Sequence, residues 1–214
     1  MIKAVIFDMD GVLLDSEPLI REAAMRMFAE HGLIVQPEDF RPFVGTGEDR
    51  FIGGVAEKYG FPLDPVRDKA RTYEIYADVV RGKIEPLNGA PEFIEKARAR
   101  GLGLAVASSA DRIKIEINLS GIGIPLGTFD AVVSGSDVTK KKPNPEGFLK
   151  AAQKLQVAPQ ECLVVEDAVN GVQAAKAAGM KCLAVMTSFT AEDLRKADWV
   201  AKDLADAPGE TLEW

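Results

Sequence analysis

The chain has 214 residues, of which 47% are hydrophobic and 28% charged, which is an ordinary composition for a protein with one large domain or two smaller ones. Its formal net charge of −7 argues against a nucleic-acid or membrane-surface partner. No apolar run approaches the roughly 18 residues of a membrane span. Cys162 and Cys182 lie in apolar runs, which favours buried free thiols in a reducing compartment over a disulfide. We therefore expect a cytoplasmic protein, and a monomer.

The N-terminal stretch is apolar and then abruptly acidic. Ala4 to Phe7 show no alternation, which predicts a strand buried on both faces. Asp8 and Asp10 follow at once, and residues two apart in an extended chain point the same way. Two carboxylates on one side repel each other, so this arrangement needs a cation or a shared proton. The alternative interpretation is an acidic turn broken by Gly11.

A helical region follows the first strand and extends to about residue 82. Its first helix is indicated by an apolar stripe and is expected to begin near Asp15 or Ser16 and to end at Gly32. The stripe consists of Ile20, Ala23, Ala24, Met27 and Phe28. Two further helical patterns lie around residues 51–59 and 70–77, with loop signals between them. Because this region contains no convincing buried strand, we expect a small all-helical module.

The second half of the chain alternates strands and helices after a turn-rich connector at residues 83–91. This alternation predicts a parallel sheet with right-handed crossovers. The expected fold is α/β, a Rossmann-like parallel-sheet core (residues 1–14 and 86–214) with an inserted all-helical cap (residues 15–85). The predicted strands are 102–107, 131–134, 162–165, 181–185 and a short one at 199–200, and the predicted helices are 111–119, 146–155 and 168–178.

Acidic side chains follow two of the predicted strands. Asp8 and Asp10 end the first, and Glu166 and Asp167 end the strand at 162–165. The carboxyl ends of parallel strands meet at one edge of a sheet. Asp8, Glu166 and Asp167 there suit a hard divalent cation such as Mg²⁺, which takes oxygen ligands. Taken alone, Glu166 and Asp167 could instead cap the next helix.

Groups that bind phosphate are expected at the same edge. Ser108 ends another strand and offers a hydroxyl, while Ser109 and Ala110 offer backbone N–H groups at a helix start. Lys142 supplies a positive charge after the third strand. Alone, Ser108 would be a turn residue and Lys142 part of a solvated basic run. Together with a carboxylate, which can attack phosphorus, these groups predict a site for phosphoryl transfer.

These segments together resemble the signatures of the haloacid dehalogenase superfamily, in the subgroup with a small helical cap after the first strand. The segments are Asp8 to Val12, Ser108 after residues 104–107, Lys142-Pro143, and Glu166 to Gly171. The resemblance implies that Asp8 is the nucleophile and Asp10 the general acid and base. It implies that Ser108 and Lys142 hold the phosphoryl group. It also implies that Asp8, the Asp10 backbone carbonyl and Asp167 hold Mg²⁺, with Glu166 supporting the metal-bound waters.

The second acid favours phosphoryl chemistry over carbon–halogen cleavage. The dehalogenases of this superfamily lack an aspartate two residues after the nucleophile and use no metal. This chain has both Asp10 and Asp167. The resemblance therefore implies a Mg²⁺-dependent phosphatase that acts through an aspartyl-phosphate on a small phosphorylated metabolite. A catalytically silent binding module would be expected to lack one of the core residues, and none is missing.

Residues 10–19 resemble the branch that contains β-phosphoglucomutase and the small sugar-phosphate or phosphoglycolate phosphatases. A sugar phosphomutase is thus the alternative function, and it needs a cap cation for a distal phosphate. The resemblance would place such cations near Val44 and Glu48, where this chain has none. That departure favours the phosphatase. Arg41, Arg50 or Arg71 could replace those cations, although a solvated cap charge is the plainer interpretation of each.

The cap loop is the predicted contact for the leaving group. Gly45 and Gly47 would let the backbone approach a ligand, and Thr46 could hydrogen-bond a hydroxyl. Arg50 is the nearby candidate cation. Opening and closing of the cap about residues 14–16 and 83–87 would admit substrate and exclude water.

Overall fold

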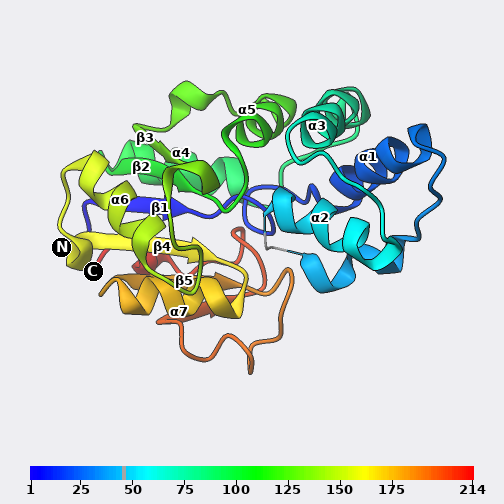
Figure 1. The fold of residues 1–214 in the computed structure, drawn as a ribbon. Coiled ribbons are helices and arrows are strands. Elements are labelled where there is room, and N and C mark those ends of the chain that lie inside the picture. The colour runs from blue at the N-terminus through cyan, green and yellow to red at the C-terminus, as the bar shows by residue number, and fades with distance from the viewer. Residues whose placement is uncertain (45–46) are drawn as a thin grey trace.

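A parallel sheet forms the centre of the fold in the computed structural model, which describes residues 1–44 and 47–214. The described residues form six strands in the order β3-β2-β1-β4-β5-β6 (Figure 1). The strands are β1 (Ala4–Phe7), β2 (Gly103–Ala107), β3 (Ala131–Val133), β4 (Cys162–Glu166), β5 (Lys181–Val185) and β6 (Trp199–Ala201). The sheet and its helices confirm the predicted Rossmann-like α/β fold.

The sheet register brings the predicted motifs to one edge. Phe7 at the end of β1 is paired with Val106 of β2 and with Val165 of β4. The residues after these three positions therefore leave the sheet side by side. They include Asp8 on the central strand, with Ser108 and Asp167 on its two neighbours. The polar residues at the predicted strand ends indicate this convergence, because the carboxyl ends of parallel strands meet at one edge of a sheet.

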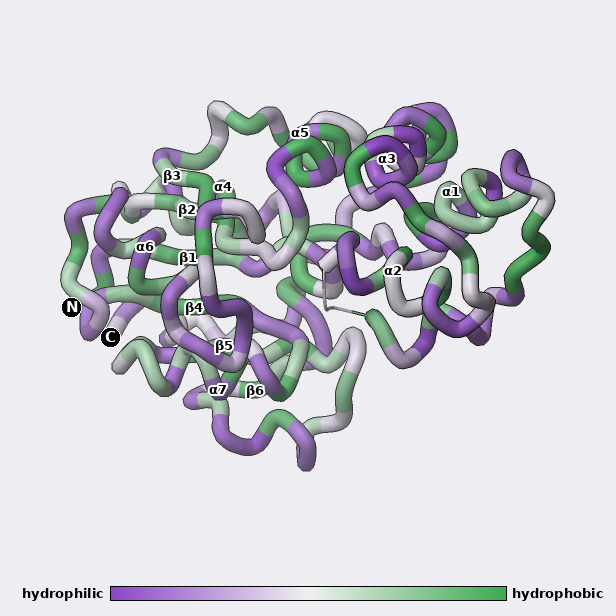
Figure 2. The backbone as a smooth tube through the Cα atoms, viewed as in Figure 1, coloured by the Kyte–Doolittle hydropathy of each residue, from purple (hydrophilic) through white to green (hydrophobic). Residues whose placement is uncertain are grey.

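Helices cover both faces of the sheet. Side chains alternate along β1, so Val5 and Phe7 belong to one core cluster while Ala4 and Ile6 belong to the other. Figure 2 shows β1 as a largely hydrophobic segment between β2 and β4. The first cluster includes side chains of α4 (Ala90–Ala99) and α5 (Arg112–Gly121), and the second those of α6 (Glu146–Leu155) and α7 (Val169–Ala177).

The helices between β1 and α4 lie beyond the carboxyl ends of the strands (Figure 1). They are α1 (Glu17–Glu30), the 3₁₀ helix η1 (Pro37–Phe43), α2 (Glu48–Tyr59) and α3 (Arg67–Val80). The chain leaves and re-enters the sheet through adjacent segments, because Leu14 forms an antiparallel bridge with Pro86 and the Leu87 N–H donates to the Leu13 carbonyl at 2.9 Å. The division into core and cap at residues 14–15 and 85–86 stays a prediction.

Two elements differ from the sequence predictions. Helix α4 was not predicted, because Gly89 and Pro91 indicated a turn. Gly89 has φ +81° and Pro91 lies in the first turn of α4, where proline is tolerated. Residues 37–43, for which the sequence predicts no separate element, form η1. Cys162 and Cys182 are buried free thiols, as predicted, and no helix of the described residues is long and apolar enough to span a membrane.

Candidate active site

Asp8 is paired with a buried lysine at the end of the central strand. Lys142 Nζ lies 2.6 Å from Asp8 Oδ1, and it also contacts Oε1 of Glu166. The Lys142 side chain is 14% exposed, so solvent screens this pair little. Burial alone would lower the pKa of Lys142, but the Asp8 and Glu166 carboxylates raise it above its usual range. Lys142 is thus a fixed positive charge beside Asp8.

Three acids converge next to this pair. Ligand oxygens of Asp8, Glu166 and Asp167 all lie within 4.8 Å of one another, and the three residues are buried. Burial is the main cause that raises the pKa of Asp8, with Lys142 opposing it. Burial, Glu166 and Asp8 raise the pKa of Asp167. A shared divalent cation would relieve this crowding, and the all-oxygen donor set fits Mg²⁺.

The absence of a side chain at Gly11 leaves room for the Asp167 carboxylate. Gly11 has φ +78°, and a β-carbon at that position would overlap the Asp167 carboxylate. Ser188, which follows β5, donates a hydrogen bond to Asp167 Oδ2. The Asp167 carboxylate is therefore held in place by packing against Gly11 and by a hydrogen bond, within a cluster of three buried acids.

The predicted phosphate-binding residues lie against the same cavity. Ser108 is 8% exposed and its Oγ accepts the Ala110 N–H at 3.2 Å. Ser109 and Ala110 precede α5, whose N-cap residue is Asp111. Ser108, Ser109 and Lys142 line a cavity of about 860 Å³ together with Asp8 and the other acids. The structure thus brings together the strand-end residues that the sequence predicted.

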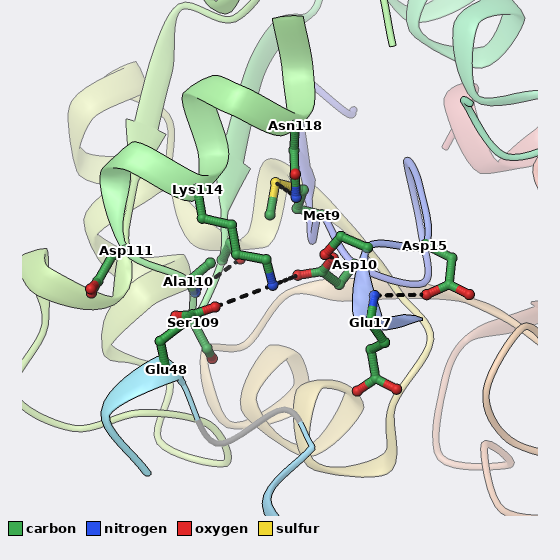
Figure 3. Close-up of polar contacts among 12 residues, drawn as sticks. Met9, Asp10, Asp15, Glu17, Glu48, Ser109, Ala110, Asp111, Lys114 and Asn118 are labelled. Atoms are coloured by element: carbon green, nitrogen blue, oxygen red, sulfur yellow. Dashed lines mark hydrogen bonds and ion pairs between the residues drawn. The ribbon is translucent and has the colours of Figure 1, made fainter. Parts of the chain in front are cut away.

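Asp10 is held separately from the acidic cluster. Ser16 Oγ donates to its Oδ1, and Lys114 Nζ lies 3.1 Å from its Oδ2. The same Nζ lies 3.2 Å from Oε1 of Glu48, which comes from α2 (Figure 3). Burial alone would lower the pKa of Lys114, but the Asp10 and Glu48 carboxylates raise it above its usual range. That the Asp10 backbone carbonyl is a metal ligand stays a prediction.

The cavity is strongly acidic. Its described lining contains seven carboxyl groups and two ammonium groups. Both ammonium groups, those of Lys114 and Lys142, are paired with carboxylates. The carboxyl groups belong to Asp8, Asp10, Asp15, Glu17, Glu48, Glu166 and Asp167. An anionic ligand in this cavity would therefore meet a net negative lining, and Lys142 is the ammonium group that contacts Asp8.

A sequence model of haloacid dehalogenase-like hydrolases matches residues 2–179 of the chain. The chain belongs to this family. It is 48% identical over 92% of its length to SUPPRESSOR OF QUENCHING 1 of Arabidopsis thaliana, of which it spans only 19%. It is 33% identical to validoxylamine A 7'-phosphate phosphatase of Streptomyces hygroscopicus subsp. limoneus, over 96% of both chains. The prediction of a phosphoric monoester hydrolase of this family is confirmed.

A solved structure of the same shape is that of a CbbY variant from Rhodobacter sphaeroides in complex with xylulose-(1,5)bisphosphate. It superposes with a TM-score of 0.88 and 27% sequence identity, over 100% of both chains. The match spans both the sheet and the helices between β1 and α4, so the whole fold of this haloacid dehalogenase-like hydrolase has a solved counterpart.

Of the predicted cap contacts in this haloacid dehalogenase-like hydrolase, Gly47 lines the cavity and Arg50 does not. Gly45 and Thr46 lie outside the described residues. Gly47 lines the cavity with φ +86°, and a β-carbon there would overlap the Lys141 ammonium. Arg50 is not among the lining residues. Its guanidinium binds the Glu57 carboxylate at 2.8 Å and lies 5.1 Å above the Phe43 ring.

Sequence reasoning missed three residues of the site. The sequence offers Asp15 or Ser16 at the start of α1; Asp15 Oδ1 accepts the Glu17 N–H at 3.1 Å, whereas the Ser16 hydroxyl bonds Asp10, a contact that the sequence does not indicate. Lys114 was not singled out, and Glu48 was considered only as the absence of a cation. One signal was available, because Lys114 lies one residue before Ile115 and five before Leu119 in the helical pattern, and a lysine that is buried with such apolar residues needs a partner.

Proposed function

We propose that the protein is a Mg²⁺-dependent phosphatase that hydrolyses small phosphomonoesters, sugar phosphates among them, through an aspartyl-phosphate on Asp8. The observation that carries the proposal is the buried contact of Asp8 with Lys142 inside the three-acid cluster. This arrangement offers a nucleophile, a cation for the phosphoryl oxygens and a cradle for the metal. The similarity to a validoxylamine A 7'-phosphate phosphatase and to a CbbY variant solved with xylulose-(1,5)bisphosphate supports this substrate class.

The first step transfers the phosphoryl group to the enzyme. An Asp8 oxygen forms a bond to phosphorus while the ester P–O bond breaks and its electron pair stays on the leaving oxygen. Asp10, in its protonated form, gives its proton to that oxygen. Lys142 and Ser108 bind the phosphoryl oxygens. Bound Mg²⁺, held by Asp8 and Asp167 with Glu166 in support, would neutralise phosphoryl charge.

The second step regenerates the enzyme. The Asp10 carboxylate takes a proton from water, whose oxygen then bonds to phosphorus. The bond between phosphorus and Asp8 breaks, which releases inorganic phosphate and restores the Asp8 carboxylate. Asp10 ends the cycle protonated, ready to serve as acid again. Ser16 and Lys114 contact the two oxygens of Asp10 and hold it for both steps.

The mutase alternative fits the cavity less well. A mutase must hold a bisphosphate, yet neither ammonium group in the described lining is free of a carboxylate. A cation at position 48 would also stand next to the Lys114 ammonium and repel it. Conversion of β-glucose 1-phosphate with a bisphosphate primer separates the two functions. Isomerisation faster than phosphate release would assign the chain to the mutases.

The test of the proposal is replacement of the nucleophile. We expect Asp8→Asn to lower hydrolysis of para-nitrophenyl phosphate by at least ~10³-fold, because it removes the carboxylate that is proposed to form the phosphoenzyme. Asp206→Asn, at an exposed aspartate outside the cavity, is the matched control and should keep full activity. Acid-quenched wild-type enzyme should carry phosphate on the peptide that contains Asp8. Retained turnover in Asp8→Asn would refute the proposal, and so would complete inactivity of the wild type across a panel of phosphate esters with Mg²⁺.

A further inference from the structure

Helix α5 presents a polar face to the helices between β1 and α4. Asp111, Lys114 and Asn118 are three and four residues apart, which places them on one side of the helix. Asp111 Oδ2 accepts the Tyr73 hydroxyl at 3.0 Å, and Asn118 Oδ1 accepts the Tyr76 hydroxyl. Lys114, between them, reaches the carboxylate of Glu48 on α2. Each polar residue of this face therefore has a partner in the predicted cap.

Lys114 differs from its two neighbours because it also contacts the catalytic acid. Its ammonium bridges Asp10 Oδ2 and Glu48 Oε1, at 3.1 and 3.2 Å (Figure 3). The side chains of Lys114 and Glu48 are only 6% and 7% exposed, so water can replace neither partner without a movement of the chain. A buried ammonium needs its carboxylates, and removal of one changes how it binds the other. The other Glu48 oxygen, Oε2, is buried without a hydrogen-bond partner among the described residues.

We propose that Lys114 and Glu48 are positioning residues that orient Asp10 for proton transfer only while α2 is seated on the core. The inference rests on the proposed function, in which Asp10 serves as acid and base. Glu48 fixes the Lys114 ammonium from the side opposite Asp10. When α2 moves away, Lys114 loses that carboxylate and turns toward Asp10, which then loses its working position. Proton transfer thus depends on a residue of the cap that touches neither the metal cluster nor Asp8.

Asp8 and Asp10 are held by different lysines. Asp8 is paired with Lys142, and Lys142 binds Glu166 rather than Glu48. A change at Glu48 should therefore spare the attack of Asp8 on phosphorus and affect only the proton that Asp10 gives to the leaving oxygen. This separation predicts a dependence on the leaving group. An ester with a weakly basic leaving oxygen needs little help from Asp10, whereas a strongly basic alkoxide needs the proton as its P–O bond breaks.

The experiment is Glu48→Gln assayed on para-nitrophenyl, phenyl and benzyl phosphates, whose leaving oxygens increase in basicity in that order. The three esters carry a similar ring and no hydroxyl group, so hydroxyl recognition by Glu48 cannot contribute. kcat/KM reports the steps up to loss of the leaving group. We expect the variant to lose about tenfold or more in kcat/KM on benzyl phosphate, to stay within about twofold on para-nitrophenyl phosphate, and to fall between on phenyl phosphate.

Glu57→Gln is the matched control, since Glu57 lies on the same helix, is 68% exposed and pairs with Arg50 outside the cavity. It should leave all three values unchanged. The double variant Lys114→Leu/Glu48→Leu removes both charges of the buried pair, which avoids leaving either charge alone. It should show the same dependence on the leaving group. Equal losses on all three esters, or no loss in either variant, would overturn the inference. The proposed function fails separately, if Asp8→Asn still hydrolyses para-nitrophenyl phosphate.

Discussion

The Glu166 carboxyl group occupies the space that a β-carbon on Gly171 would fill. Glu166 is wholly buried at the end of β4, and its Oε2 accepts the N–H groups of Asp167 at 2.9 Å and Ala168 at 2.8 Å. Its other oxygen contacts Lys142. Gly171, in the first turn of α7, therefore serves the site by being small, which lets the acid fold back against its own helix.

Replacing this glycine should damage the site more than the fold. We expect Gly171→Ala to lower kcat/KM for para-nitrophenyl phosphate about tenfold or more, because the added methyl group displaces Glu166 from Lys142 and the acidic cluster. The same change should raise the Mg²⁺ concentration that gives half-maximal activity. A Mg²⁺ titration of the initial rate measures both effects.

Gly53→Ala in α2 is the control for this substitution. A β-carbon at Gly53 meets nothing within 4 Å, so alanine there should leave activity unchanged. It should also stabilise the protein by up to about 1 kcal/mol, the usual gain when alanine replaces glycine inside a helix. Full activity in Gly171→Ala would show that Glu166 tolerates displacement and does not support the metal site.

The acidic cluster predicts a pH-dependent stabilisation by Mg²⁺. Burial raises the pKa values of Asp8 and Asp167 in the folded protein. A carboxyl group whose folded pKa is raised favours folding at low pH and opposes it as pH rises from the ordinary aspartate value of about 4 through the raised value. Mg²⁺ binds the ionised carboxylates and removes this penalty. The rise in melting temperature on adding Mg²⁺ should therefore be small near pH 5 and larger near pH 8.

Calorimetry or thermal melts of the metal-free protein, with Mg²⁺ or with K⁺ at matched ionic strength, provide the measurement. The Asp167→Asn variant lowers the number of charges in the cluster and should show a smaller Mg²⁺ effect at the higher pH. A shift of equal size at both pH values would mean that Mg²⁺ acts elsewhere on the protein.

The core of the site was predictable from sequence because its signals are local. A buried strand followed by a polar residue is visible without a structure, and parallel strands bring such residues to one edge. Asp8, Ser108 and Asp167 stand at the ends of predicted strands, and Lys142 follows the third predicted strand after a loop, so all four are indicated by their place in the strand pattern. Helix α4 was missed because Gly89 and Pro91 carry turn signals that the start of a helix also uses.

The Asp10 contacts could not be predicted for a different reason. Lys114 and Glu48 are 66 residues apart in sequence (114 minus 48) and belong to different helices, so no local pattern pairs them. Their contact exists because α2 and α3 dock against one face of α5, and the geometry of that docking is a tertiary property. Ser16 stands at the start of α1, where the sequence predicts the helix to begin near Asp15 or Ser16, but its hydroxyl binds Asp10.

A carboxylate inside the predicted cap should stabilise it above acidic pH. Asp39 accepts hydrogen bonds from the Gln36 N–H at 2.8 Å and the Tyr59 hydroxyl at 2.6 Å, and it contacts the Lys58 ammonium. Lys58 first, then Tyr59 and the Gln36 N–H, lower the pKa of Asp39 to about 2. We expect Asp39→Asn to lower the free energy of unfolding by about 1–2 kcal/mol at pH 7, the scale of a hydrogen bond to a charged group.

The pH dependence of this effect has a definite sign. Because the folded pKa of Asp39 is lowered, its stabilisation is complete above the unfolded value of about 4 and is lost as pH falls toward 2. Urea unfolding at pH 7 and at pH 3 should therefore show a smaller difference between wild type and Asp39→Asn at the lower pH. Glu38→Gln, at the exposed neighbouring residue, should change stability little at either pH. A difference that grows on acidification would contradict this assignment.

The charge of the cavity predicts discrimination against a second phosphate. A monophosphate places its dianion at Lys142 and the metal cluster, but a distal phosphate would face Asp15, Glu17 and Glu48 in the described lining. We expect kcat/KM for fructose 1,6-bisphosphate to be about tenfold or more below that for fructose 1-phosphate, because like charges repel across a poorly screened cavity. Added salt should narrow the gap by screening the exposed part of this repulsion.

Glu17→Gln tests the electrostatic origin of this preference. Burial and the Asp10 and Asp15 carboxylates raise the pKa of Glu17, so the charge of Glu17 interacts with the other carboxylates of the cavity. Removing its charge should raise the bisphosphate-to-monophosphate ratio of kcat/KM about threefold, while Glu22→Gln, on the same helix but outside the cavity, should leave the ratio unchanged. If the wild type hydrolyses both esters equally well, then a cation must reach the distal phosphate when substrate binds, and the mutase alternative regains support.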